Sequence, residues 1–521
     1  MGRSCNLLFA FVVFILLHTS LSSVPNISTD EAALLAFKSH ISSFAPNNIL
    51  ATNWSSSRPV CSWIGITCSS RHHRVTALDI SNMQLYGIIP PHLGNLSFLV
   101  SLDISDNTFH GNLPQELAHL QRLKLINVTS NNFTGAIPSF LSLSPNLRIV
   151  LLSDNQFSGE VPSSLSNLTK LEVLAIQGNF LVGEIPQELG DLRYMTALNM
   201  ESNHLTGSIP PSIFNSTTMR VIALTNNNLT GELPTTICDH LPNLVGLYLS
   251  RNDLDGVIPP TLEKCRKLQI LSLSINEFSG TVPRELANLT SLTGLYLGEQ
   301  HLGGEIPEEL GNLKNLQVLS LYHSEFTGSV PANIFNMSAL QNLALEANSL
   351  SGTLPSELGR GMPRIEKFNC ADNYLSGFIP ASISNFTRLN GLDFGINSFI
   401  GPIPESIGNI QYLELLDLAA NNFSSDSTLS FLASLTNCRK IRVIRFGWNP
   451  LDGVFPASVE NFSDSLQIFD GSNCKMKGII PEEIGNLTTL AIMNLDNNEF
   501  TGQVVIFQKP SKACGTFKNL T

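Results

Sequence analysis

The chain has little charge and no extended region of one sign. Asp, Glu, Lys and Arg make up 14% of its 521 residues, and the formal net charge is −12. Proteins that bind nucleic acids neutralise phosphates with clustered Lys and Arg side chains, so this composition argues against nucleic acid as a partner. Beyond the N-terminal segment, no apolar run reaches the roughly 18 residues that a membrane helix needs. We therefore expect no membrane span in this chain.

The sequence also lacks the short motifs that mark catalytic and metal sites. It contains no kinase HRD or DFG motif, no glycine-rich loop followed by a strand lysine, no GxSxG and no HExxH. The histidines are scattered, and the RHHR segment at 71–74 lacks further ligands, so we expect it to be a solvated surface. Carboxylates such as Glu160 and Glu184 recur at repeat-surface positions. We predict that the chain is not an enzyme and has no catalytic residues, no cofactor and no metal site.

The first 23 residues have the composition of a secretory signal peptide. Arg3 gives a positive start, an apolar run covers residues 7–17, and serines follow at positions 20, 22 and 23. Asn-X-Ser/Thr sequons number fifteen, a density typical of the secretory route. These features predict a secreted or cell-surface protein.

A repeat of 24 or 25 residues fills most of the chain. The tetrapeptide Gly-X-apolar-Pro marks it, beginning with GIIP at Gly87. The repeat continues to Gly478 and decays to GQVV at Gly502. One degenerate turn lies in the wider gap between Gly401 and Gly453, which gives about eighteen turns. One turn cannot bury its apolar face alone, so neighbouring turns must stack.

The segment at 147–162, LRIVLLSDNQFSGEVP, shows how one turn folds. Val150 and Leu152 alternate with outward neighbours, as in a short strand. Asn155 stands four residues before Gly159, and Asn takes this place in fourteen of the turns. Its side-chain amide can bond to backbone groups of its own and the adjoining turn, which a buried bend would otherwise leave unpaired. We call this position the ladder position.

The full pattern, LxxLxLxxNxLxGxIPxxLxxL, resembles the plant-type leucine-rich repeat and covers roughly Val75 to Val505. The resemblance implies an α/β leucine-rich-repeat solenoid, a right-handed superhelix with a concave parallel β-sheet and short helical segments on the convex side. The irregular turn at 427–444 is similar to the immune-receptor kinase subfamily of flagellin and elongation-factor receptors and a rice bacterial-resistance receptor. We expect four regions: signal peptide 1–23, N-terminal cap 24–74, repeats 75–506 and an irregular truncated tail 507–521.

The cap resembles the N-terminal cap of plant leucine-rich-repeat receptors. The segment STDEAALLAFKSHI is predicted to be helical, with Ser28 and Glu31 placed as a capping box. In NWSSSRPVCSWIGITC, two cysteines bracket Trp63, and the resemblance implies a disulfide between Cys61 and Cys68.

The remaining cysteines divide by position. Cys238 and Cys265 lie on the convex side of adjacent turns, so a disulfide between them is expected. Cys370 falls on an inward strand position as an apolar core filler, and a bond from Cys438 to Cys474, which replaces a ladder Asn, is not expected. The pairing of four cysteines stays open: Cys370, Cys438, Cys474 and Cys514.

A solenoid of this type binds ligands on its concave strands, where the outward positions lie four and two residues before the ladder position. Tyr248, Tyr296 and Tyr322 occupy such positions in mid-array, and exposed tyrosines are good binding residues. Gln300 and Ser324 replace the ladder Asn beside them, and a broken local rule points to function. The predicted patch also includes four flanking residues: Arg251, Glu299, His323 and Glu346.

A second candidate patch consists of Asp393, Arg445 and Trp448. The alternative for both patches is ordinary surface variation, because strands favour tyrosine in any case.

Glycans are expected away from these strands. Eight sequons fall eight residues after a repeat glycine, on the lateral or convex side: Asn95, Asn167, Asn215, Asn288, Asn336, Asn385, Asn461 and Asn486. Asn127 alone points to the concave face, where a glycan would obstruct the third turn and leave the middle turns free.

The resemblance implies a ligand-recognition ectodomain of a plant pattern-recognition receptor, with a peptide or microbial protein fragment as ligand and a co-receptor kinase near the C-terminal repeats. The chain as given lacks the anchor and kinase of such receptors, so we also consider a truncated receptor or a soluble decoy. The alternative from another class is a secreted inhibitor of cell-wall-degrading enzymes, similar to polygalacturonase inhibitors, although those have a shorter array of about ten turns and a closed C-terminal cap.

Overall fold

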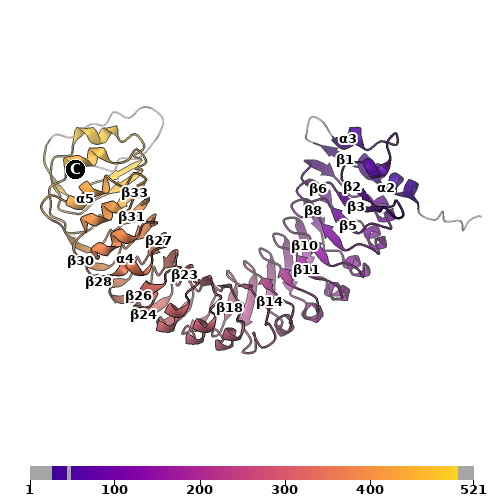
Figure 1. Ribbon diagram of the computed structural model, residues 1–521, viewed down its shortest axis with the longest axis horizontal. Coiled ribbons are helices and arrows are strands. Elements are labelled where there is room, and N and C mark those ends of the chain that lie inside the picture. The colour runs from indigo at the N-terminus through magenta and orange to yellow at the C-terminus, as the bar shows by residue number, and fades with distance from the viewer. Residues whose placement is uncertain (1–25, 44–48, 503–521) are drawn as a thin grey trace, which may run out of the picture. The chain divides into compact units, whose positions relative to one another are not determined.

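The computed structural model describes residues 26–43 and 49–502. The predicted signal peptide and tail, with Cys514, lie outside the described residues. The chain divides into two compact units, one ending at Asn203 and the other starting at His204. Each unit is a stack of turns in which a first strand, a second strand and, in most turns, a short helix follow one another, and the colours of Figure 1 trace this order along the chain.

The cap of unit 1 begins with helix α2 (Ile27–Ser39), which is capped by Asn26. Asn26 Oδ1 accepts hydrogen bonds from the amides of Ser28 and Thr29 at 3.0 and 3.2 Å, and Thr29 Oγ1 accepts one from the Asn26 amide at 3.2 Å. The predicted capping box of Ser28 and Glu31 is therefore wrong, because the helix begins two residues earlier than that box requires.

A buried ion pair joins the cap to the repeats. Arg74 donates to both carboxylate oxygens of Asp30 at 2.8 and 2.7 Å, and the Val75 amide donates to the same carboxylate at 3.0 Å. Both charged side chains are nearly closed to solvent. The prediction of a solvated RHHR surface is therefore wrong for Arg74, because Asp30 holds it inside, although His72 and His73 are exposed.

The rest of the cap packs around two tryptophans and a disulfide. The Trp54 and Trp63 rings stack with centroids 5.6 Å apart. The Cys61–Cys68 disulfide is present, with an S–S distance of 1.98 Å, which confirms the expected pairing. The cap's other elements are α3 (Ile49–Asn53), η1 (Val60–Ser62), β1 (Ile41–Ser43) and β2 (Ile66–Cys68).

The first strands of successive turns form a parallel, in-register sheet in each unit; Leu174, for example, pairs with Leu198 in unit 1 and Leu247 with Leu271 in unit 2. In unit 1 these strands are β3 (Val75–Asp79), β5 (Ser101–Asp103), β7 (Leu125–Asn127), β9 (Ile149–Leu151), β11 (Val173–Ala175) and β13 (Ala197–Asn199). In unit 2 they are β15 (Val221–Ala223), β17 (Gly246–Tyr248), β19 (Ile270–Ser272), β21 (Gly294–Tyr296), β23 (Val318–Ser320), β25 (Asn342–Ala344), β27 (Lys367–Asn369), β29 (Gly391–Asp393), β31 (Leu415–Asp417), β33 (Val443–Arg445), β34 (Ile468–Asp470) and β36 (Ile492–Asn494). Six turns in unit 1 and twelve in unit 2 match the predicted number within the described residues.

Second strands follow the ladder position of most turns and also pair in parallel with one another. In unit 1 they are β4 (Leu85–Gly87), β6 (Thr108–Gly111), β8 (Asn132–Gly135), β10 (Gln156–Glu160) and β12 (Phe180–Glu184). In unit 2 they are β14 (His204–Ser208), β16 (Asn228–Glu232), β18 (Asp253–Asp255), β20 (Ser279–Gly280), β22 (His301–Glu305), β24 (Glu325–Ser329), β26 (Ser349–Thr353), β28 (Tyr374–Gly377), β30 (Ser398–Pro402), β32 (Asn422–Ser424), β35 (Lys477–Gly478) and β37 (Glu499–Phe500). Figure 1 shows the labelled first strands of unit 2 from β23 to β33 along one side and the second strands from β24 to β30 along the other.

Short helices complete most turns after the proline. Because proline fixes its own φ and cannot donate a backbone hydrogen bond, it ends the second strand and permits a helix to start. The 3-10 helices are η2 (Pro91–Asn95), η3 (Gln115–His119), η4 (Ser139–Leu143), η5 (Ser163–Asn167), η6 (Gln187–Asp191), η7 (Pro211–Phe214), η8 (Pro260–Lys264), η9 (Arg284–Asn288), η10 (Glu308–Asn312), η11 (Ile334–Asn336), η12 (Ala381–Asn385), η13 (Glu405–Asn409), η14 (Ala457–Asn461) and η15 (Glu482–Asn486). Two turns have α-helices instead, α4 (Leu358–Gly361) and α5 (Ser430–Leu435), and α5 belongs to the irregular turn seen in the sequence.

The ladder residue ties neighbouring turns together as predicted. Asn155 Nδ2 donates to the carbonyls of Val128 and Leu152 at 2.9 and 3.3 Å, and its Oδ1 accepts from the Phe133 amide at 3.0 Å. The residue before it, Asp154, has a φ of 52°. A left-handed residue precedes the ladder position in every described turn, so each turn fixes one side chain at the end of its first strand.

Apolar side chains fill the space between strands and helices. Inward residues such as Val150 and Leu152 are fully buried. In unit 1, the rings of Phe109, Phe133 and Phe157 stack turn by turn with centroids 6.4 Å apart. These findings confirm the predicted leucine-rich-repeat solenoid fold.

Candidate functional site

Three tyrosines lie on the exposed face of the first-strand sheet of unit 2, which we call the strand face. Tyr248 and Tyr296 each pair with Ser272 of the strand between them. Tyr322 follows Ser320, which pairs with Tyr296. All three tyrosines are half-buried. The structure thus brings the predicted tyrosines onto one face.

Each tyrosine ring rests on a glycine. A Cβ added to the glycine would meet the ring closely in three pairs: Gly246 with Tyr248 Cε2 (2.5 Å), Gly294 with Tyr296 Cε2 (2.8 Å) and Gly298 with Tyr322 Cδ1 (2.5 Å). Such distances are closer than van der Waals contact, so the rings occupy space that only glycine leaves open. Sequence reasoning missed these platforms, although the repeated tetrapeptide GLYL at 246–249 and 294–297 contains the signal.

Charged residues border the tyrosines at one end of the strands. Arg251, Glu299 and His323 each occupy the left-handed position before the ladder residue, with φ of 58°, 54° and 48°. His323 Nδ1 lies 3.9 Å from Glu299 Oε1. Burial raises the pKa of Tyr296, and it raises the pKa of Tyr322, with a further rise from Glu299 and a lowering by Arg251. Both phenols are therefore neutral hydrogen-bonding groups at neutral pH.

Glu346 links the two predicted patches. Its Oε2 is buried and has no hydrogen-bond partner among the described residues. Burial raises the pKa of Glu346, nearby Asp393 raises it further, and His323 lowers it. Glu346 therefore interacts electrostatically with His323 of the first patch and with Asp393 of the second patch.

The second patch is a row of paired charges on the strand face. Asp393 pairs with Asp417, Asp417 with Arg445, and Arg445 with Asp470, on four consecutive strands. Arg445 Nη1 lies 3.3 Å from Asp417 Oδ2. Burial, together with the adjacent Asp417, raises the pKa of Asp393 to about 6, although the Gly395 amide and Arg445 lower it. Burial also raises the pKa of Asp417. Sequence reasoning singled out Asp393 and Arg445 but missed Asp417 between them.

Two large apolar side chains project beside this row from left-handed backbone. Trp448 is 64% exposed with a φ of 58°, and Ile396 is 57% exposed with a φ of 49°. A β-branched residue such as Ile396 rarely adopts a left-handed backbone conformation, because this conformation is sterically unfavourable. The surrounding turn therefore has to stabilise Ile396 in it. Ile396 was not among the predicted residues.

The ladder is broken beneath the tyrosines. Gln300 Nε2 still donates to the Leu273 carbonyl at 3.0 Å, but the longer side chain leaves its Oε1 buried without a partner in the described part of the chain. Ser324 is too short to span the turns, and its hydroxyl donates to the Tyr322 carbonyl at 3.3 Å. The predicted irregularity is therefore a loss of cross-turn hydrogen bonds at the tyrosine patch.

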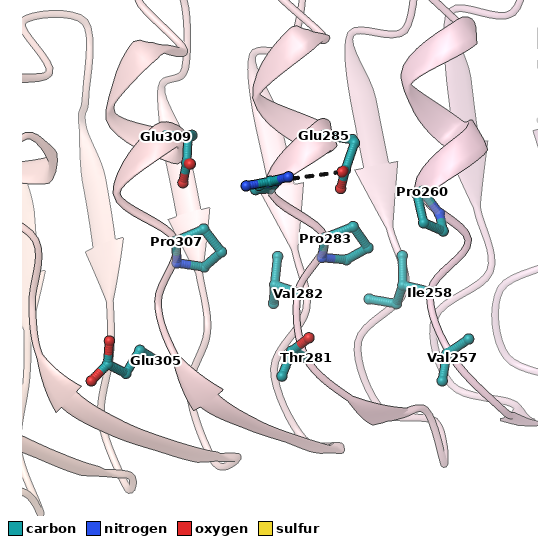
Figure 2. A pocket seen from close by; sticks show the side chains of 11 residues that line it. Val257, Ile258, Pro260, Thr281, Val282, Pro283, Glu285, Glu305, Pro307 and Glu309 are labelled. Carbon is teal, nitrogen blue, oxygen red and sulfur yellow. Dashed lines mark ion pairs between the residues drawn. The ribbon is translucent and has the colours of Figure 1, made fainter.

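An open cavity of about 520 Å³ lies on the flank of three of these turns (Figure 2). Its lining residues are Val257, Ile258, Pro260, Thr281, Val282, Pro283, Arg284, Glu285, Glu305, Pro307 and Glu309. The second strands are short at this point. β20 has two residues, and Val257 pairs with Ser279 of β20 through a single bridge. The dashed contact in Figure 2 joins Arg284 and Glu285 at 3.5 Å. Sequence reasoning missed this cavity.

The structure also shows where the other predicted cysteines and glycan sites lie. The Cys238–Cys265 disulfide is present, with an S–S distance of 2.05 Å, and Cys370, Cys438 and Cys474 are free and buried. All eight predicted glycan sites are exposed. Asn127 is half-buried, and its Nδ2 donates to Asp103 Oδ2 at 2.9 Å.

Residues 26–43 and 49–502 contain neither a candidate membrane-spanning helix nor a candidate metal site. No helix there is both long and apolar enough to cross a membrane. No group of three or more His, Cys, Asp or Glu side chains there is arranged to hold a metal ion.

Comparison with known families and sequences identifies the repeat. Residues 27–69 match the leucine rich repeat N-terminal domain, and five segments match the Leucine Rich Repeat family: 98–120, 146–168, 194–216, 243–265 and 267–289. The LRR receptor-like serine/threonine-protein kinase EFR of Arabidopsis thaliana is 48% identical over 71 residues, 14% of this chain and 7% of that protein. The receptor kinase-like protein Xa21 of Oryza sativa subsp. japonica is 39% identical over 82 residues, 15% of this chain and 8% of that protein. The matches thus span less than a tenth of these curated relatives.

Solved structures match over most of the chain. The ectodomain of the Arabidopsis receptor kinase HAESA, in complex with the peptide hormone IDA and the co-receptor SERK1, has a TM-score of 0.65 and 27% identity, with 91% of this chain and 90% of that chain covered. The PEPR1–AtPEP1 structure has a TM-score of 0.61 and 28% identity, with 91% and 79% covered. The chain thus resembles the leucine-rich-repeat ectodomains of plant receptor kinases in its fold, and six of its segments match leucine-rich-repeat families.

Proposed function

We propose that the chain is a ligand-recognition ectodomain that binds a peptide or a microbial protein segment on the strand face of unit 2. The observation that carries this proposal is the set of three tyrosine rings seated on glycines beside Arg251, Glu299 and His323. Rings held in place against a sheet offer large contact areas at a low cost in conformational entropy.

The solved relatives support this class of ligand. HAESA is described with a peptide hormone and the co-receptor SERK1, and RGFR1 with RGF2. By analogy, a co-receptor kinase would dock near the C-terminal repeats of this chain. Similarity to the receptor kinases EFR and Xa21 supports a position on the extracellular face of the plasma membrane. We extend the proposal to plant defence because the irregular turn at 427–444 resembles the immune-receptor subfamily.

The charge of the strand face suggests the character of the ligand. Glu346, Asp393 and Asp417 are partly buried carboxylates, and burial raises the pKa of each. Asp393 further raises the pKa of Glu346, and Asp417 further raises that of Asp393. Arg445 is the cation paired within their row. A ligand with a Lys or Arg side chain would relieve this repulsion. We therefore propose a peptide that carries aromatic or apolar residues for the tyrosines and a basic residue for the carboxylates.

The test uses the secreted full chain and a random peptide display library. Enriched peptides should be rich in Lys or Arg. The double variant Tyr296→Ala with Tyr322→Ala should weaken their binding about 30- to 900-fold, since buried tyrosine contacts contribute about 1–2 kcal/mol each. The matched control replaces Tyr194 and Tyr412, which are exposed outside the strand face, and should leave the affinity unchanged. Equal affinity of the peptides for the double variant and the wild-type protein would remove this face as the binding site.

The alternative is an inhibitor of cell-wall-degrading enzymes or a soluble decoy. The repeat alone is compatible with it. Inhibition of a polygalacturonase by the purified chain, unchanged in the Tyr296 and Tyr322 double variant, would favour the inhibitor.

A further inference from the structure

An apolar patch is exposed on the second sheet of unit 2, away from the strand face. Tyr374, Phe378 and Ile400 are 65%, 60% and 42% exposed, and they come from strands β28 and β30 and the residue that follows β28. We call these three residues the flank patch. In the two preceding turns the positions of Tyr374 and Phe378 carry polar residues: Glu325, Ser329, Ser349 and Thr353. Phe378 and Ile400 lie on neighbouring strands, and large exposed apolar side chains side by side on a soluble surface indicate that something covers them.

The geometry of the patch is fixed by a glycine. A Cβ added to Gly401 would lie 2.2 Å from Phe378 Cε1, so the Phe378 ring lies directly on the backbone of β30. Gly377 pairs with Phe399, which places Phe378 beside Ile400. The Phe378 ring is thus held against the backbone of β30, with Ile400 next to it on that strand.

The next strand places a glycosylation sequon against this patch. In β32, Asn422 pairs with Ile400, and Ser424 pairs with Pro402. Asn422 and Ser424 are exposed, whereas Phe423 between them is fully buried. Paired residues of adjacent strands project on the same side about 4.8 Å apart. Asn422 therefore projects on the same side as Ile400, in line with Phe378.

We propose that Asn422 carries an N-linked glycan whose first sugars pack over Ile400 and Phe378. Asn422 Nδ2 would form a bond to the anomeric carbon of a lipid-pyrophosphate-linked oligosaccharide and lose one proton, while the lipid pyrophosphate leaves. The C–H face of N-acetylglucosamine is apolar, so it can cover aromatic and aliphatic side chains and remove them from water. The proposal rests on passage through the secretory route, which the proposed extracellular function also requires, but it does not depend on any ligand.

The chain contains a matched site without the apolar neighbours. Asn228 has the same place in its turn, directly after a ladder Asn, and an Asn-Leu-Thr sequon at the start of β16. It pairs with Thr206 rather than with an apolar side chain. A glycan on Asn228 would therefore extend into water and bury little protein surface.

The experiment compares single-site variants of the secreted full chain produced in plant cells. Glycopeptide mass spectrometry should find Asn422 modified. Removing the glycan by Asn422→Gln or by Ser424→Ala should increase the fluorescence of a dye that binds exposed apolar surface and lower the Tm by about 2 °C, since the packed sugars bury a small apolar area. Asn228→Gln should change neither quantity. Adding Phe378→Ser to the Asn422→Gln variant should return the dye signal toward the wild-type value, because the ring that the sugars cover is gone.

Several results would overturn the proposal. An unmodified Asn422 in the secreted protein would do so, as would equal dye binding by the Asn422→Gln and Asn228→Gln variants. Self-association of the wild-type protein that Phe378→Ser abolishes would assign the flank patch to a second copy of the chain. Failure of the peptide-binding test would leave these measurements unaffected, so the two proposals can fail separately.

Discussion

Asp393 should reduce the stability of the protein at neutral pH, and replacing it with asparagine should increase that stability. Its pKa of about 6, compared with an ordinary value of 3.8, means that the folded state resists ionisation of this carboxyl group. The difference between these two pKa values corresponds to at most about 3 kcal/mol. Because the side chain is only half-buried, solvent screening reduces the expected gain to about 1–2 kcal/mol.

The structure indicates that asparagine fits this position. Asp393 Oδ1 accepts a hydrogen bond from the Gly395 amide at 3.1 Å. Asn127 and Asn369 occupy the same position of other turns, and each Oδ1 accepts from the amide two residues later at 3.1 and 3.0 Å. Asp393→Asn therefore keeps the local hydrogen bond and removes only the charge.

The sign of the pH dependence follows from the raised pKa. At pH 3, below both pKa values, the carboxyl is mostly protonated in both the folded and the unfolded state, so it has almost no differential effect. As the pH rises from about 4 to 6, the unfolded chain ionises while the folded chain stays protonated, so folding stability is lost over this range and the loss is complete above pH 6. Asp393→Asn should therefore raise the Tm by about 1–2 °C at pH 7.5 and leave it unchanged at pH 3.

The assay is calorimetry of the full chain at both pH values. The control is Asp470→Asn, because the Asp470 carboxylate accepts from Ser472 at 3.0 and 2.8 Å and pairs with Arg445, so its replacement should bring no gain. The reasoning is refuted if Asp393→Asn has no effect at pH 7.5, or if it stabilises the protein equally at both pH values.

Three further predictions concern stability, measured by urea unfolding. Asp30→Asn should cost about 3 kcal/mol or more, because it leaves the Arg74 charge buried without its partner; a loss below about 1 kcal/mol would contradict the buried pair. Ser324→Asn should gain about 1 kcal/mol by restoring the cross-turn hydrogen bonds, and no gain would mean that the turn cannot accept the regular ladder. Asn26→Ala should cost about 1 kcal/mol more than Ser28→Ala, since both remove the same sequon but only the first removes the helix cap; equal losses would contradict Asn26 as the cap.

The repeat made most of the fold predictable from sequence. Glycine, proline and the ladder Asn recur at fixed spacing, so the same local structure is predicted for each of the eighteen turns. Both expected disulfides followed from position or resemblance. The predicted capping box was wrong because Asn26 and Ser28 are both suitable N-cap residues at the start of α2. The spacing of the residues alone does not determine which of the two caps the helix. Arg74 was misplaced because its partner, Asp30, is 44 residues away in the sequence.

The candidate site was less predictable. Position in the repeat located the tyrosines, because the strand alternation is regular. The contacts of Gly246 with Tyr248 and of Gly294 with Tyr296 lie within single strands, where the GLYL tetrapeptide carries the signal. The contact of Gly298 with Tyr322, the interaction of Glu346 with Asp393 and the cavity on the flank depend on contacts between turns, which the spacing of one turn does not encode.

The left-handed residue before each ladder position has a consequence for how recognition could change over time. The hydrogen bonds of the ladder residue on one side and of the first strand on the other fix the backbone of this residue, whichever side chain it carries. Positions such as Arg251, His323 and Trp448 can therefore exchange side chains of very different chemistry without altering the path of the chain. A protein built in this way can acquire new binding specificities by single substitutions, and each new side chain enters a site whose backbone is already ordered.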